Sequence, residues 1–443
     1  MSLFNTLNTG AAGLGVSSVN LSVIGDNIAN INTVGYKGSS ARFADLLPES
    51  VGGLGGSYQI GRGSRLAAMS TTFSQGALNA TGSALDLAIT GNGFFQVSGE
   101  GGDYYTRDGS FFLDESGFMV NSQGMKVQGF TANDGSLTTL PGDLQIDTSP
   151  IPHSATTEVA LNVTLAGDDG EVDDSDSPVA DATLDGQTES IADMADAADY
   201  ATSITIYDSL GVAHDATVLF EKNTDGSWSW TAVVDGSEID GLEDDEANEG
   251  MAFAIAGGDL TFDDEGQLTA ATSTDLTGGD TFVGAAAISM DFLFGKDSAG
   301  EDTDGGIQES GNESFLSSIS QDGYATGNLT TVDVDDDGTI VGTYSNGEEI
   351  VLGQVAIATF PAEGELARVG GNLFSATPNS GDPALGVAGT GGRGSISGYT
   401  LEGGNVELEE EFVNMIQTQR SYQANARIVS TADETLQELV NLV

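Results

Sequence analysis

The chain has 443 residues, and its 68 acidic side chains against 12 lysines and arginines give a formal net charge of −56 at pH 7. Such a charge repels phosphate and excludes nucleic acid as a partner. The absence of cysteine excludes disulfides and thiolate metal sites. The two histidines, His153 and His214, lie in acidic, turn-rich surroundings that argue against a histidine-based triad or zinc site. No carboxylate pair is singled out by its spacing, so we expect neither a cofactor nor a catalytic site.

The negative charge is concentrated in the middle of the chain. Residues 127–367 carry 50 acidic and 2 basic side chains, whereas residues 1–126 and 368–443 are close to neutral. A polyanionic surface keeps molecules apart. We therefore expect the terminal segments to make contacts between molecules and the middle to face solvent.

The N-terminal segment 1–32 has the periodicity of an amphipathic helix with two seams. In the second seam, small residues such as Gly10 and Ser17 allow another helix to approach closely. An amphipathic helix that merely covers a globular core is the simpler alternative. The first seam recurs every seven residues and consists of Leu7, Leu14, Leu21 and Ile28.

A helix end is expected at the asparagines that follow. Asn30 and Asn32 tolerate the left-handed conformation of a helix cap, and Gly35 relieves the turn. Tyr36 and Lys37 are then expected to face a neighbouring molecule, with Lys37 bridging subunits or, equally, lying in solvent. Lys37 is also the first positive side chain of the sequence, so we expect no cleaved secretory signal. No apolar run reaches the roughly 18 residues of a membrane span, and membrane insertion is not expected.

Between the ends, the pattern changes to the two-residue period of strands, with Asp-Gly, Ser-Gly and Asn-Gly turns. We expect residues 33–75 to form an extended linker and residues 76–149 and 321–402 to form an inner β-domain. Residues 150–320 are expected to form an acidic outer β-domain, in which the most acidic stretch, 166–200, is an exposed loop or insertion. The fold class is therefore mainly β with terminal α-helices.

The run DVDDDGTIVGTY, Asp333 to Tyr344, places acids and a glycine as an EF-hand loop does. Its twelfth position is Tyr344, however, where a calcium-binding loop needs a bidentate glutamate, and strands rather than helices flank it. A hairpin turn is the favoured interpretation, and a weak calcium site is the alternative.

The C-terminal segment 403–443 shows the alternating four- and three-residue spacing of a coiled coil, which imposes a left-handed supercoil. Asn405 is expected to be its N-cap, and the glutamates that follow suit the positive end of the helix dipole. The seam positions, mostly apolar or aromatic, are Leu408, Phe412, Met415, Gln419, Tyr422, Ala426, Val429, Asp433, Leu436, Val440 and Val443. The two terminal helices are therefore expected to pair as a coiled coil at the base of the β-domains.

Both terminal segments contain long motifs of a known family. The stretch NIANINTVGYKG, Asn27 to Gly38, resembles the signature that follows the N-terminal helix in the bacterial flagellar rod and hook family. The stretch FVNMIQTQRSYQANARIVSTADETLQELVNL, Phe412 to Leu442, is similar to the closing helix of the same family. The length of the chain and the runs SITIYDSLGVAHDATVLFEK and TVDVDDDGTIVGTYSNGEEIVLGQVAIATFP are similar to hook subunits rather than rod subunits.

The resemblance implies a structural subunit, not an enzyme, that polymerises with itself into a curved, flexible tube linking rod to filament and transmitting torque. It implies export through the flagellar type III apparatus, a location in the extracellular flagellum, and contacts with rod, hook-cap and hook–filament junction proteins. The terminal seams would then form the interface between copies, which we expect to comprise Leu7, Leu14, Leu21, Ile28, Asn30, Asn32, Gly35, Tyr36, Leu408, Phe412, Met415, Tyr422, Val429, Leu436 and Val440.

Two alternatives remain at this point. A distal rod protein shares the terminal motifs but would lack the insertion at about 150–320. An acidic, calcium-dependent surface adhesin or surface-layer protein would explain the middle of the chain but not the heptads at its two ends.

Overall fold

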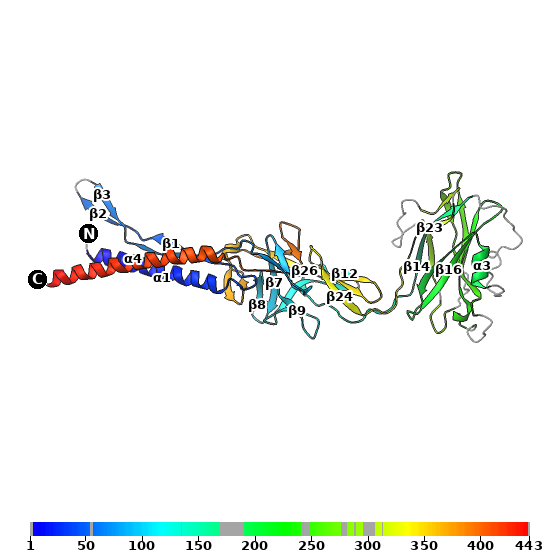
Figure 1. The fold of residues 1–443 in the computed structure, drawn as a ribbon, viewed down its shortest axis with the longest axis horizontal. Helices are drawn as coiled ribbons and strands as arrows, with labels where there is room; N and C mark the ends of the chain where they lie inside the picture. Colours follow the sequence, from blue (N-terminus) through cyan, green and yellow to red (C-terminus); the bar gives the residue numbers. More distant parts are fainter. Residues whose placement is uncertain are drawn as a thin grey trace. The chain divides into compact units, whose positions relative to one another are not determined.

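The computed structural model divides the chain into two units (Figure 1). Unit 1 comprises Met1–Thr148, Thr330–Thr343 and Glu349–Val443, and unit 2 comprises Ser149–Leu329 and Tyr344–Glu348. The residues that the structure describes are 3–53, 56–133, 135–167, 190–240, 242, 249–275, 281–287, 289–295, 306–311 and 313–441.

Unit 1 contains the two terminal helices, α1 (Leu3–Ala29) and α4 (Leu408–Asn441). They lie side by side and run antiparallel, because Gly10 approaches Val429 while Asn27 reaches Glu411. The predicted fold class, mainly β with paired terminal helices, is confirmed. None of the helices that the structure describes combines the length and apolar character needed to cross a membrane.

The segment that follows α1 forms an antiparallel ribbon, which we call the arm (residues 39–71; Figure 1). β1 (Ser39–Asp45) pairs with β4 (Ser64–Thr71), and beyond them β2 (Glu49–Gly53) pairs with β3 (Gly56–Ile60). The expected linker 33–75 thus contains paired strands, and its base lies against α1, where Gly63 approaches Ala12.

The β-domain of unit 1 is built from both halves of the sequence. In its main sheet the strands run in the order β24-β25-β26-β11-β7-β8-β28-β27, so that β26 joins strands from before and after unit 2. Phe94 and Phe374 pack in its core with Tyr105 and Phe360. The strands are β5 (Leu78–Ala80), β6 (Ala88–Thr90), β7 (Phe94–Gly99), β8 (Gly102–Thr106), β9 (Phe111–Leu113), β10 (Met119–Asn121), β11 (Lys126–Asn133), β12 (Ser136–Leu137), β13 (Gly142–Asp143), β24 (Leu329–Val334), β25 (Thr339–Tyr344), β26 (Glu349–Thr359), β27 (Ala367–Gly370), β28 (Leu373–Ser375), β29 (Ala384–Val387), β30 (Ser395–Ser397) and β31 (Thr400–Glu402), with a 3-10 turn at Glu363–Glu365.

The acidic Asp333 loop is the hairpin turn between β24 and β25, as predicted. Asp335 N donates to the carbonyl of Thr339, and the Asp333 carboxylate accepts from the Tyr399 hydroxyl at 2.6 Å. No group of three metal-ligating side chains occurs in the part of the chain that the structure describes.

Unit 2 is a β-sandwich of two sheets. One sheet has the order β21-β14-β22 with β23 beside β14, and the other has the order β15-β16-β17-β18-β19 with β20 beside β18. Both tryptophans of the chain, Trp228 and Trp230, are fully buried between the sheets. The elements are β14 (Glu158–Ala166), α3 (Ile191–Ala197), β15 (Tyr200–Tyr207), β16 (Ala213–Lys222), β17 (Trp228–Asp235), a 3-10 turn (Gly236–Glu238), β18 (Ala252–Phe262), β19 (Leu268–Ala271), β20 (Thr274–Asp275), β21 (Asp291–Phe294), β22 (Gln308–Ser310) and β23 (Phe315–Gln321).

The acidic stretch 166–200 was expected to be a loop or insertion. Its residues 168–189 lie outside the described residues, and the flanking parts are the end of β14, helix α3 and the start of β15.

Candidate assembly site

The two terminal helices contact each other through small and polar side chains. A Cβ atom on Gly10 would lie 2.9 Å from Val429 Cγ2, and one on Gly13 would lie 2.6 Å from Asn425 Nδ2. Two turns further along, Asn20 Nδ2 donates to Thr418 Oγ1 at 2.9 Å. Hence glycine at these two positions is what permits the close approach of α1 to α4.

The structure separates the two predicted seams of α1. Gly10, Ser17 and Ile24 of the second seam are buried on the side of α1 that packs against α4. The residues of the first seam are only half-buried: Leu7, Leu14, Leu21 and Ile28.

On α4 the helix pairing shares only part of the predicted seam, since Val429 lies against Gly10 but other contacting residues are outside the seam. The α1-facing positions Thr418 and Ala432 are buried and Asn425 is half-buried, at intervals of seven residues. Of the predicted seam, Met415, Val429 and Leu436 are half-buried. Leu408 (41%), Phe412 (47%) and Tyr422 (41%) are exposed. Val440 lies in α4, and its side chain is outside the described residues.

Large apolar side chains therefore lie on the outside of the helix pair. Phe412 is joined by Val413 and Ile416, whose exposed fractions are 53% and 50%, and on α1 Phe4 is 70% exposed. Exposed apolar patches on a folded surface mark sites of interaction with another molecule. The helix pair thus presents to its surroundings the kind of side chain that a core normally covers.

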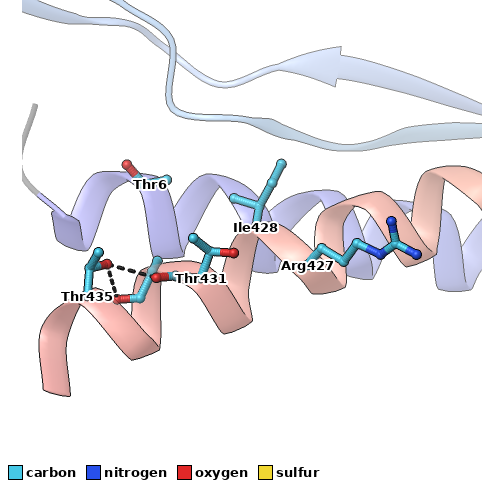
Figure 2. A pocket seen from close by; sticks show the side chains of 6 residues that line it. Thr6, Arg427, Ile428, Thr431 and Thr435 are labelled. Carbon is cyan, nitrogen blue, oxygen red and sulfur yellow. Dashed lines mark hydrogen bonds between the residues drawn. The ribbon is translucent and has the colours of Figure 1, made fainter. Parts of the chain in front are cut away.

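Near the far end of the pair, α1 and α4 enclose a pocket of about 430 Å³ (Figure 2). Its lining consists of Thr6 from α1 and of Arg427, Ile428, Thr431, Ala432 and Thr435 from α4. The Thr435 hydroxyl donates back to the carbonyl of Thr431 at 2.8 Å, so that its methyl group is free to line the pocket. Arg427 is the one ionisable side chain of the lining, and the pocket is suited to an apolar side chain.

Where the helices meet the β-domain, three charges are buried in one cluster, which we call the junction. Lys37 Nζ lies 2.7 Å from Glu402 Oε1, and both side chains are 0% exposed. Arg107 NH1 lies 3.3 Å from the other oxygen, Glu402 Oε2. Burial lowers the pKa of Lys37 below its ordinary value, and the hydrogen bond to Glu402 acts in the opposite direction. Burial likewise lowers the pKa of Arg107, again opposed by Glu402.

The junction is also hydrogen-bonded to the backbone on every side. Glu402 Oε1 accepts from Gly76 N at 2.8 Å, Lys37 Nζ donates to the Ser74 carbonyl at 2.8 Å, and Arg107 donates to the Gly91 carbonyl at 2.7 Å. The cluster thus ties the end of α1, the first β-strands and the approach to α4 into one body. The expectation that Lys37 bridges subunits or lies in solvent is wrong, since its partner Glu402 lies in its own chain.

Asn27, the first residue of the N-terminal motif, holds the two helices and the arm together. Its Nδ2 donates to the Ser39 carbonyl and to Glu411 Oε1, at 2.9 and 2.8 Å. Its Oδ1 accepts from Ser39 N and from the Tyr36 hydroxyl. Tyr36 is 2% exposed, and burial raises its pKa.

Asn405 has a different role from the predicted one. The first helical hydrogen bond of α4 runs from Glu411 N to the carbonyl of Glu407, so the helix begins beyond Asn405. The side chain of Asn405 instead accepts from Gly38 N at 2.8 Å and donates to the carbonyls of Thr72 and Ser74. The prediction of an N-cap is therefore wrong, because the residues that flank the arm, Gly38 and Thr72–Ser74, occupy the side-chain groups that a cap would use.

The turn after α1 follows the prediction more closely. Asn30 N donates to the Asp26 carbonyl, and Asn32 is exposed just beyond the end of the helix. Gly35 has φ +66°, and a Cβ there would lie 2.4 Å from Asp108 N. Glycine is thus required at this position by its conformation and by the close approach of the β-domain.

A helix pair that leaves its large apolar side chains outside and is joined to a β-domain by a buried ion cluster is typical of a structural subunit. Four family models match the chain: flagella basal body rod protein (residues 7–37), flagellar hook protein FlgE/F/G D1 domain (88–173), flagellar basal body protein FlaE D2 domain (174–324) and flagellar basal body rod FlgEFG protein C-terminal (397–442). The chain belongs to the flagellar hook protein family.

Relatives of full length support this assignment. The chain is 35% identical to the flagellar hook protein FlgE of Salmonella typhimurium, over 97% of this chain and 98% of that protein. It is 32% identical to FlgE of Borreliella burgdorferi, over 99% and 100% of the two chains. Among solved structures, flagellar hook protein FlgE2 of Helicobacter pylori shares the fold, with a TM-score of 0.50 at 15% identity, covering 72% of this chain and 98% of that chain.

Sequence reasoning missed most of the junction. Asn27 and Lys37 belong to the quoted motif, but nothing indicated their partners. Arg107 and Glu402 are 295 residues apart in the chain. The available signal was that Lys37 and Arg107 are two of only 12 basic residues in a chain with 68 acids.

Proposed function

We propose that this chain polymerises through its terminal helices into the tube of the flagellar hook, a curved joint that carries torque from rod to filament. Its role is structural rather than catalytic. The observation that carries the proposal is the set of large apolar side chains on the outer face of α4, at Phe412, Val413 and Ile416. The neighbours that cover them are further copies of the same chain.

The repeated contact must be heterologous for a tube to form. Head-to-tail contacts that do not close into a ring generate an open helical filament. The half-buried seam of Leu7, Leu14, Leu21 and Ile28 and the exposed face of α4 supply two different apolar surfaces on one subunit, as such a contact requires. The domain boundaries fit the same scheme, with residues 1–32 and 403–443 in an inner tube, 76–149 and 321–402 around it, and 150–320 outermost.

The rod, the hook cap, the hook–filament junction proteins and the type III export apparatus are the further partners in this proposal. Terminal helices whose apolar faces are uncovered in the free subunit are easily unfolded, which suits passage through a narrow export channel. Bending of the tube would then use sliding between the polar surfaces of the β-domains while the helix contacts hold.

Electron microscopy of basal bodies from cells that lack this gene tests the proposal. Complete rods that end without a hook are expected. Truncated rods would assign the chain to the rod instead, and intact flagella would contradict the proposal and favour a surface adhesin.

A further inference from the structure

Of the ten lysines and arginines in unit 1, five have a partner within the chain, and the other five lie on two surfaces. Lys37, Arg107 and Lys126 form ion pairs, Arg368 lies over the ring of Tyr36, and Arg393 donates to backbone carbonyls. Among the residues that the structure describes, six exposed arginines form no ion pair, and Arg368 is one of them; the other five, which also have no aromatic partner, are Arg42, Arg62 and Arg65 on the arm and Arg420 and Arg427 on α4. In a chain of net charge −56, unpaired arginines are scarce and their position is informative.

The arm is a positive and partly apolar surface. Its residues 39–71 contain three arginines and two acids, although the chain as a whole is strongly negative. Arg42 pairs with Ala68 and Arg65 with Ala44, so the two arginines lie close together along the ribbon. Ala68, opposite Arg42, lies on the same face of the ribbon and is exposed, whereas Leu66 and Met69 pair with Phe43 and Ala41 on the other face.

The first two turns of α4 have the complementary character. Glu407, Glu409 and Glu410 are exposed there, and the helix dipole favours acids at this end. The dipole does not account for the apolar side chains between them. Leu408, Phe412 and Ile416 recur every four residues and are 41%, 47% and 50% exposed. Glu409 is three and four residues before Phe412 and Val413, so it flanks the same face.

We propose that the arm of one copy docks on the first two turns of α4 of a second copy. Arg42 and Arg65 would face Glu409 and Glu410, and the aliphatic stems of the two arginines, with Ala68 on the same face, would cover Phe412 and Ile416. Within one copy none of these arginines is ion-paired to the glutamates, so a second copy is the partner that this charge complementarity indicates. The inference rests on the proposed polymerisation and specifies one of its contacts.

The two kinds of side chain have different roles in this contact. Exposed ion pairs contribute little affinity, so burial of the apolar residues holds the contact together. The opposite charges select the partner surface and its register and repel the acidic surfaces that cover the rest of the chain. Such selection is needed where almost every other surface is negative.

Charge reversal in the purified full-length chain tests the contact. Arg42→Glu/Arg65→Glu and Glu409→Arg/Glu410→Arg are each expected to reduce the polymer recovered by sedimentation at least tenfold, and the combined fourfold variant is expected to restore most of it. The first variant makes the chain more negative and the second makes it less so, hence a general charge effect cannot weaken both. Glu100→Arg/Glu115→Arg, in exposed turns of the β-domain, is the matched control and is expected to polymerise normally.

Disulfide crosslinking gives an independent measurement, since the chain has no cysteine of its own. Arg65→Cys/Glu409→Cys polymers, once oxidised, are expected to give a ladder of linked subunits on a denaturing gel. A disulfide confined to the monomer, or no disulfide, would overturn the inference. Charge-reversal variants that polymerise as the wild type does would also overturn the inference about this contact. The proposed function would not be affected by that result. A wild-type chain that never polymerises would instead contradict the proposed function.

Discussion

Unit 2 and the terminal helix pair of unit 1 differ in the burial of their large apolar side chains. In unit 2, Trp228 and Trp230 are fully buried between two sheets, as expected of a domain that is stable by itself. In the helix pair, glycine and threonine face inward, while Phe412 and Ile416 face outward. The sandwich thus covers its large apolar side chains within one molecule, whereas the helix pair leaves several of them exposed, as the proposed polymerisation requires.

The two regions also have separate spectroscopic signals. Both tryptophans lie in unit 2, so their fluorescence follows the sandwich. Of the α-helices in the described parts of the chain, α1 and α4 of unit 1 have 27 and 34 residues and α3 of unit 2 has seven, so the helical circular dichroism of these elements comes mainly from unit 1. Each prediction below can therefore be assigned to one unit.

The largest effect on stability is expected from Glu402→Ala. The substitution leaves Lys37 and Arg107 buried without their carboxylate, and the loss of one partner from a buried ion pair costs about 3–5 kcal/mol. Chemical unfolding followed by circular dichroism should show this loss, with tryptophan fluorescence unchanged. Asp143→Ala, which removes the exposed partner of Lys126, is the control and should cost less than about 1 kcal/mol. Equal effects of the two would refute the role given to the junction.

A smaller loss is expected from Gly13→Leu. Its side chain would meet Asn425, which a Cβ atom alone already approaches to 2.6 Å, and overpacking of this kind costs about 1–3 kcal/mol. The helical signal should unfold at lower denaturant, whereas Gly15→Leu should have no such effect, since nothing lies within 4 Å of that position. If Gly13→Leu were harmless, the close packing of α1 on α4 would be wrong.

Polymerisation is expected to weaken as salt is lowered. Each subunit adds a net charge of −56, and screening over about 10 Å at 0.1 M is lost in dilute salt. The local attraction between the arm and α4 grows under the same conditions but involves only a few charges. Light scattering between about 0.5 M and about 0.02 M salt measures the outcome; polymers that strengthen steadily on dilution would show that local attraction dominates.

The smallest effect concerns the pKa of Lys37, which burial lowers from its ordinary 10.5. Below 10.5 the unfolded chain therefore binds this proton more tightly than the folded chain does. The stability that depends on an uncharged Lys37 is therefore complete above pH 10.5 and decreases as the pH falls toward the lowered pKa of the folded chain. Between these two pKa values the free energy of unfolding rises with pH. Between about pH 8 and about pH 9.5, the wild type should gain a few tenths of a kcal/mol relative to Lys37→Met. If the stability of the wild type relative to Lys37→Met instead decreased with rising pH, the pKa of Lys37 would be raised by folding and not lowered.

Periodicity predicted the elements of the fold well. The heptads of the two ends and the alternating patterns around Ile204, Val218 and Trp230 correspond to α1, α4, β15, β16 and β17. These patterns are local, and each element could be recognised from its own residues.

The junction and the phase of the helix pair could not be predicted in the same way. Glu402 meets Lys37 across 365 residues of chain, and only the folded backbone brings them together. On α4, the apolar stripe was taken as the pairing seam, but α1 contacts Thr418 and Asn425, which lie outside the stripe, together with Val429, which belongs to it. An apolar stripe in a sequence predicts that a helix face is covered, but it does not tell whether another segment of the same chain or a neighbouring chain covers it.

The outward face of α4 is therefore where the account is tested most directly. The measurement is the polymerisation of Phe412→Ser/Ile416→Ser, with its unfolding followed by circular dichroism. We predict that polymers are lost while the free energy of unfolding changes by no more than about 0.5 kcal/mol, as for exposed positions. Normal polymers, or a subunit that unfolds without them, would contradict the claim that these side chains are placed for a neighbouring copy.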